Sequence, residues 1–239
     1  PNLHMEAPDH EMYHKHSREL MAFLRSYTPD IEQVSVDECY MDFTGILGRF
    51  ASPVEAAFEI KDEVKKRFGF TVNIGISDVK VLAKMASDFE KPDRVHTLFR
   101  KEIQEKMWPL PISDLFMAGH SSVETLRKLE IQTIGDLAKA DPKLIELHLK
   151  SHGRRLWEFA NGMDDSIVES EKAEAKGVGN STTLSKDVST KEDAQKVLLS
   201  LAQSVGGRLR KHRYHAGVVN VEIKYADFTV NSHQKQLER

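Results

Sequence analysis

Two acidic residues stand side by side where two strand-like segments almost meet. Residues 31–36 alternate apolar and polar side chains, as a half-buried strand does, and residues 40–44 form a second strand-like run before Gly45. Because so few residues separate the runs, we predict a β-hairpin with Asp37 and Glu38 at its tip. Adjacent carboxylates repel each other unless a cation or basic group lies near them. The tip therefore fits a Mg²⁺ site, although acidic residues are also typical of a solvated turn.

The pattern divides the chain into an α+β part, an all-helical part and a second α+β part. Helical and strand-like segments alternate over residues 1–108, whereas residues 109–167 carry only short helical runs punctuated by proline and glycine. Residues 168–177 are charged and poor in large apolar side chains, so we predict an exposed linker there. Residues 178–239 form the third part.

Hydrophobic periodicity and capping residues give the expected element boundaries. Beside the hairpin, the expected helices cover residues 9–27, 53–68, 79–89 and 190–212. The expected strands cover residues 70–76, 95–99, 179–184 and 218–225. The second helix has the clearest start, because Ser52 can cap it, Pro53 suits its first position and Glu55 completes a capping box.

Composition limits the classes of protein that this chain can be. Hydrophobic residues make up 40% of its 239 residues, which is enough for a packed core. No apolar run approaches the roughly 18 residues of a membrane span, so a transmembrane protein is excluded and we expect no membrane partner. Cys39 is the single cysteine, which excludes an internal disulfide framework and favours a reducing compartment such as the cytoplasm.

The net charge of −3 hides an uneven distribution along the chain. Residues 178–239 carry ten basic and six acidic side chains, a net charge of +4, which leaves −7 for the remainder. The densest basic cluster ends the expected long helix and consists of Arg208, Arg210, Lys211 and Arg213. We expect this cluster to follow nucleic-acid phosphates, with a solvated helix end as the alternative.

The residues around the hairpin resemble a motif of a known enzyme family. Ser35 to Asp42 resembles the Ser-x-Asp-Glu-x-x-x-Asp motif of the Y-family, or lesion-bypass, DNA polymerases, in particular the DNA polymerase IV-like and ImpB/MucB/SamB-type members. Further segments occur in family order: residues 73–77, 80–88 and 91–92 resemble its palm, residues 110–112 and 133–138 its thumb, and residues 179–184 the opening of its little finger. The resemblance covers nearly the whole chain.

The resemblance implies an α+β fold with three named parts. They are a partial palm with a ferredoxin-like antiparallel or mixed sheet and helices (residues 1–108), an all-helical helix-hairpin-helix thumb (109–167) and, after the linker (168–177), a partial α+β little finger (178–239). The family's first palm strand with its metal-binding aspartate, its fingers and the end of its little finger are not recognisable here. We therefore expect a fragment that does not extend a primer by itself.

The resemblance also implies an activity: template-directed DNA synthesis across damaged DNA by nucleotidyl transfer with two Mg²⁺ ions. Asp37 and Glu38 would be the catalytic metal ligands, and Lys91 would contact the triphosphate of the incoming nucleotide. Asp93 and Arg94 follow where the family usually has Asn-Gly. The implied partners are primer-template DNA, deoxynucleoside triphosphates and a sliding clamp.

A loop in the helical part corresponds to the family's phosphate-binding turn. By resemblance, Gly119, Ser121 and Ser122 would contact a DNA phosphate, although Met117 stands where the family has the first glycine. An ordinary helix–helix turn is the alternative. Lys84, on the expected helix 79–89, we interpret as a solvated surface lysine.

Two other functions stay open at this point. One is a non-catalytic DNA-binding module that keeps the helix-hairpin-helix, and the other is a nucleotidyl cyclase, because related palm folds also place carboxylates on a hairpin. The thumb-like and basic parts disfavour the cyclase.

We predict that DNA binding is weak, salt-sensitive and carried mainly by residues 178–239, because the positive charge lies there. Each phosphate neutralised should add about −0.9 to the log–log salt slope on duplex DNA. The measurement compares the chain with a version truncated at Lys176. Unchanged affinity after truncation would show that the basic part does not hold the DNA.

Overall fold

A computed structural model of the chain describes residues 3, 5–171 and 176–237. The chain forms two compact units, Pro1–Lys172 and Ala173–Arg239. Residues 172–175, in the middle of the expected linker, lie outside the described residues.

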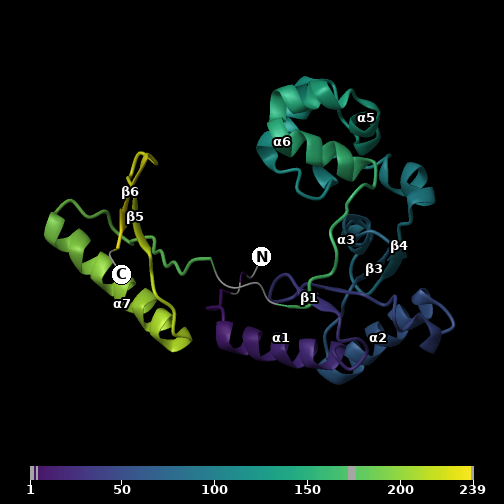
Figure 1. The fold of residues 1–239 in the computed structure, drawn as a ribbon, viewed down its shortest axis with the longest axis horizontal. Coiled ribbons are helices and arrows are strands. Elements are labelled where there is room, and N and C mark those ends of the chain that lie inside the picture. The colour runs from purple at the N-terminus through teal and green to yellow at the C-terminus, as the bar shows by residue number, and fades with distance from the viewer. Residues whose placement is uncertain (1–2, 4, 172–175, 238–239) are drawn as a thin grey trace. The chain divides into compact units, whose positions relative to one another are not determined.

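The first unit is mainly helical with short strands, whereas the described residues of the second unit form a long helix and an antiparallel pair of strands (Figure 1). The first unit contains α1 (His10–Leu24), β1 (Ile31–Gln33), β2 (Cys39–Met41), α2 (Pro53–Phe68), β3 (Ile74–Ile76), α3 (Lys80–Asp88), β4 (Val95–Thr97), α4 (His120–Lys128), α5 (Ile134–Lys139) and α6 (Pro142–Ala160). The second contains α7 (Lys191–His212), β5 (Val218–Lys224) and β6 (Val230–Gln236). None of the helices in the described ranges combines the length and the apolar character needed to cross a membrane.

The caps of α2 follow the sequence prediction with one shift. The Ser52 hydroxyl accepts a hydrogen bond from the Glu55 N–H at 3.1 Å. The Glu55 carboxylate accepts from the Ala51 N–H at 2.8 Å, one residue earlier than the usual capping box. Gly69 ends the helix with a left-handed φ of 77°, a conformation that costs glycine little. The predicted helix is therefore confirmed at both ends.

The predicted hairpin is confirmed, with shorter strands than the pattern indicated. β1 and β2 pair antiparallel, with Ile31 opposite Met41 and Gln33 opposite Cys39. Residues 34–36 leave the ladder because the N–H groups of Val34 and Ser35 both donate to the Glu38 carbonyl, at 3.0 and 3.2 Å. This turn places Asp37 and Glu38 at the tip.

The palm sheet implied by the resemblance is present as separate ladders. β3 and β4 pair in parallel, with Ile74 opposite Val95, and among the described residues every ladder joins only two strands. Helix α3 lies directly against β3 at Gly75, where an added Cβ would come within 1.9 Å of the Ala83 carbonyl oxygen. Only a residue without a side chain permits this approach.

Two hydrophobic cores hold the first unit together. The smaller core joins α1, β1 and α2 through residues such as Met21, Ile31 and Val64. The larger core joins α3 to the helices α4, α5 and α6. Leu82 and Leu126 are both fully buried in it, so α3 shares a core with the helical part.

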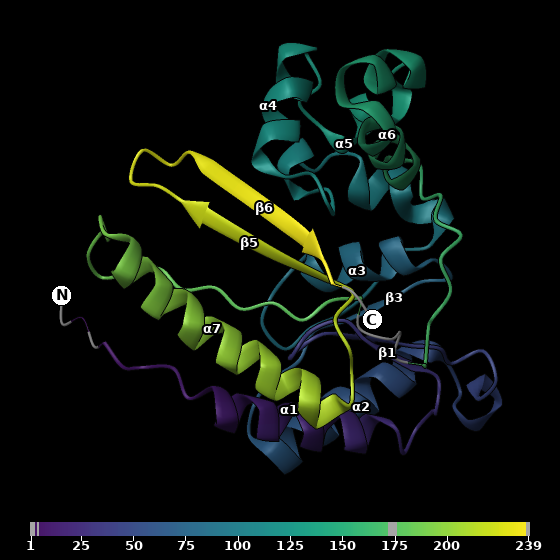
Figure 2. The same cartoon turned by 60° about the vertical axis from the view of Figure 1, so that its left-hand side comes forward.

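The strand predicted over residues 179–184 is wrong, because that segment is irregular. The partner of β5 is instead β6, in a register running from Val218 opposite Gln236 to Lys224 opposite Val230 (Figure 2). The pattern missed β6 because it is polar after its first residue, so no apolar alternation marks it. Backbone hydrogen bonding to β5, rather than burial, forms this strand.

We predict that Gly75→Ala destabilises the first unit by about 3 kcal/mol, because the methyl group collides with the backbone of α3. Gly48→Ala is the matched control, since nothing lies within 4 Å of an added Cβ there. Urea unfolding followed by circular dichroism measures both variants. Equal stabilities would contradict the close packing of α3 on β3.

Candidate active site and nucleic-acid interface

The hairpin tip is shaped by the hydroxyl of Ser35. This hydroxyl donates to Asp37 Oδ1 at 2.6 Å and accepts from the Glu38 N–H at 3.1 Å. Both acidic side chains remain exposed. Ser35 therefore closes the turn and fixes one of the two predicted catalytic carboxylates, while both stay open to solutes.

A chain of alternating charges links the tip to the predicted nucleotide-binding lysine. Lys84 Nζ lies 2.6 Å from Glu38 Oε1 and 3.0 Å from Asp88 Oδ2. Asp88 Oδ1 in turn lies 2.7 Å from Lys91 Nζ. The interpretation of Lys84 as a solvated lysine is wrong, because only 18% of its side chain is exposed and it contacts two carboxylates.

Lys84 and Asp88, the two middle residues of this series of charges, are stabilised in their charged forms. Burial opposes the charge on Lys84, but hydrogen bonds to Glu38 and Asp88 outweigh it and raise the pKa of Lys84. Burial likewise opposes the charge on Asp88, and hydrogen bonds from Lys91 and Lys84 outweigh it, so the pKa of Asp88 is lowered. An unbroken series of minus, plus, minus and plus charges follows.

A second lysine of α3 braces the base of the hairpin. Lys80 Nζ lies 2.6 Å from Glu32 Oε2, 2.9 Å from the Ile167 carbonyl oxygen and 4.8 Å above the Tyr40 ring. The Glu169 N–H also donates to Glu32, at 2.8 Å. Lys80 thus ties α3, the hairpin and the segment after α6 together, a role that the sequence alone did not reveal.

The turn after Lys91 is anchored where it departs from the family pattern. Asp93 has a left-handed φ of 63°. Its carboxylate oxygens accept from Lys61 Nζ at 2.9 Å and Lys65 Nζ at 2.8 Å, both on α2. Lys91 itself is 56% exposed, so its ammonium group can reach a ligand in solution.

The donor set at the tip fits a cation that keeps much of its water. Among the residues that the structure describes, no group of three His, Cys, Asp or Glu side chains could hold a metal ion. Asp37 and Glu38 supply two carboxylates, and Mg²⁺ is commonly held by one or two carboxylates completed by water and substrate phosphates. The tip therefore fits Mg²⁺ in the presence of a triphosphate, and it does not form an all-protein metal cage.

The predicted phosphate loop lies at the start of α4. Gly119 is the N-cap residue, and no side chain caps the helix. The first N–H groups of a helix lack intrahelical partners, so they are available to a phosphate. Ser121 is exposed, whereas the side chain of Ser122 packs into the core, which leaves its backbone N–H for the predicted contact. Met117 takes a left-handed φ of 68° in place of the family's glycine.

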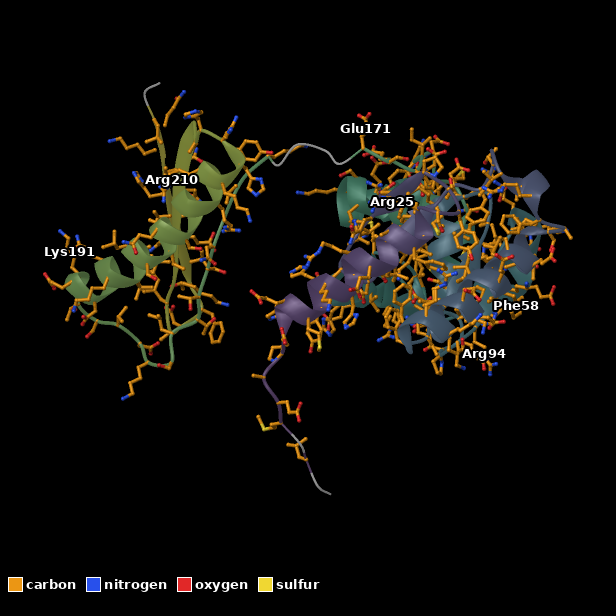
Figure 3. All side chains as sticks on the ribbon, turned by 90° about the horizontal axis from the view of Figure 1, so that it is seen from below. Arg25, Phe58, Arg94, Glu171, Lys191 and Arg210 are labelled. Carbon is orange, nitrogen blue, oxygen red and sulfur yellow. The ribbon has the colours of Figure 1, made fainter. Side chains whose placement is uncertain are left out.

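The predicted basic cluster lies at the C-terminal end of α7. Arg210 and Lys211 are exposed in the last turn, and Arg213 ends the helix with a φ of 57°. Figure 3 labels Arg210 and, towards the other end of α7, Lys191. Arg208 donates from its guanidinium to the Gly179 carbonyl, so it is tied to the start of the unit.

Family comparisons match both ends of the chain. The model of the impB/mucB/samB family matches residues 1–88, and that of the impB/mucB/samB family C-terminal domain matches residues 175–239. Together these segments take in more than half of the chain.

Named relatives agree with the family models. DNA polymerase IV of Clostridium acetobutylicum is 44% identical over 238 residues, which is 100% of this chain and 60% of that protein. DNA polymerase IV 1 of Bacillus subtilis is 38% identical over 229 residues, which is 95% of this chain and 55% of that protein. The chain thus spans less than two thirds of the length of these relatives.

Solved structures agree on the fold. A Y-family DNA polymerase chimera matches with a TM-score of 0.83 and 23% identity, over 97% of this chain and 66% of that chain. DinB from Sulfolobus solfataricus matches with a TM-score of 0.63 and 23% identity, over 97% and 67%. Fold, family models and relatives agree, and the chain belongs to the impB/mucB/samB family of Y-family, DNA polymerase IV-like proteins.

Proposed function

We propose that the whole protein performs template-directed DNA synthesis across damaged DNA, and that this chain carries part of its active site. The observation that carries the proposal is the acidic hairpin tip, joined through Lys84 and Asp88 to the exposed Lys91. Nucleotidyl transfer requires a group that binds cations close to a group that binds phosphates. Here the hairpin tip would bind the cations and Lys91 the phosphates. The parts of the chain then correspond to palm, thumb, linker and partial little finger.

Each proposed site residue has a distinct task. Asp37 and Glu38 hold divalent cations at the tip, and Ser35 keeps the turn in shape. Mg²⁺ held by these carboxylates would supply activation of the primer 3′ hydroxyl and stabilisation of the charge on the transferring phosphoryl group. Lys91 attracts the triphosphate of the incoming nucleotide, because its ammonium group is exposed in the turn that follows α3.

The proposed grip on DNA is spread over both units. Backbone N–H groups at residues 120–122 bind a phosphate at the start of α4, where no side chain caps the helix. Gly119 leaves room for the phosphate, while its own N–H donates to the Met117 carbonyl at 3.0 Å. Arg210, Lys211 and Arg213 follow phosphates by charge. Arg208 adds charge to the same end of α7. Primer-template DNA, deoxynucleoside triphosphates and a sliding clamp are the proposed partners.

The two alternative functions receive less support. The relatives reported above are named DNA polymerases, whereas neither a non-catalytic helix-hairpin-helix module nor a nucleotidyl cyclase is among them. A cytoplasmic location is part of the proposal, because the single cysteine fits a reducing compartment.

We predict that Asp37→Asn in the whole protein lowers primer extension in Mg²⁺ at least about 100-fold, because a charge that holds the ions is lost. Asp42→Asn is the matched control. It removes the same charge at the base of the hairpin, while its side-chain oxygen can still accept the Thr44 N–H that lies 2.7 Å from Asp42 Oδ1.

The control variant should retain near-normal extension, and thermal melts should show both variants folded. If the Asp37→Asn variant extended primers at a near-normal rate, the hairpin tip would not be the site that holds the metal ions. We expect the 239-residue chain alone not to extend a primer, because two carboxylates do not complete a two-ion site.

A further inference from the structure

We propose that Lys84, which Asp88 also holds, is the resting counter-ion of Glu38, and that it competes with the divalent cation for that carboxylate. This inference rests on the proposed function of the hairpin tip. It assigns Lys84 as a positioning residue that occupies a catalytic carboxylate until a cation takes its place.

The geometry makes Lys84 a shared partner. Its ammonium nitrogen lies 2.6 Å from Glu38 and 3.0 Å from Asp88, so one cation serves two carboxylates. Its side chain is 18% exposed, and burial of the stem on α3 limits where the ammonium group can go. Glu38 is 47% exposed, so a solute can approach its other face.

Because Lys84 and Asp88 pair with each other, Glu38 and Lys91 can each bind a ligand without leaving a neighbouring charge unpaired. When a divalent cation takes Glu38, Lys84 keeps Asp88, its neighbour one turn along α3. When a triphosphate takes Lys91, Asp88 keeps Lys84. An uncompensated, partly buried charge is costly, and this arrangement avoids it at both steps. Glu38 and Lys91 can therefore exchange partners independently.

Cation affinity is the direct measurement, because a merely structural role for Lys84 would not raise it. The probe is Mn²⁺ alone, added to the 239-residue chain, with free Mn²⁺ followed by electron paramagnetic resonance. Lys84→Met keeps the length of the stem and removes the charge. We expect it to tighten Mn²⁺ binding about fivefold, the scale of one such ion pair. Lys84→Gln, a second neutral variant, should act in the same direction.

Lys80→Met is the matched control. Lys80 is a lysine of the same helix with a similar exposure of 15%, but it is paired with Glu32 at the base of the hairpin. It should change Mn²⁺ affinity less than about twofold, because it does not contact the tip. Adding Glu38→Gln to Lys84→Met should abolish the gain, since the freed carboxylate is its source. Thermal melts establish that each variant is folded.

The outcomes separate this inference from the proposed function. The single substitution Asp37→Asn, with Lys84 intact, should weaken Mn²⁺ binding relative to the wild-type chain. Unchanged binding would show that the hairpin tip is not the metal site. If Asp37→Asn weakens binding while both Lys84 variants bind no tighter than wild type, the competition is wrong and the metal site stands. A gain in Lys80→Met equal to that in Lys84→Met would also overturn the competition.

Discussion

The close packing of α3 against β3 is the constraint on which the site depends. The Ala83 carbonyl lies so near Gly75 that no side chain fits between the helix and the strand. With α3 held at this distance, its apolar face enters the larger core and its charged face meets the hairpin. One helix therefore sets both the stability of the first unit and the geometry of the acidic tip.

Opposite faces of α3 explain how a site with exposed carboxylates can still be ordered. Leu82 and Met85 anchor the helix among buried side chains. Lys80 and Lys84, one turn apart, reach the base and the tip of the hairpin respectively. The packed face of α3 fixes the position of the helix, and the two lysines orient the hairpin against it through their ion pairs.

Local features of the fold could be predicted from the sequence, whereas long-range pairing could not. The hairpin follows from apolar alternation on either side of Asp37 and Glu38, and α2 follows from its caps. β6 could not be predicted, because it is held by backbone bonds to β5 and has almost no apolar pattern. The Lys84–Glu38 contact joins residues 46 apart, so it depends on how α3 meets the hairpin and leaves no local signal.

Paramagnetic broadening by Mn²⁺ locates the cation site on the protein. The broadening of backbone amide signals in NMR spectra falls steeply with distance from the ion, so it locates the ion without reference to activity. We predict that the strongest broadening falls on residues 35–40, followed by weaker broadening of the backbone amides around Lys84 on α3. Broadening centred on another acidic segment, with the hairpin signals unchanged, would show that the hairpin tip is not the cation site.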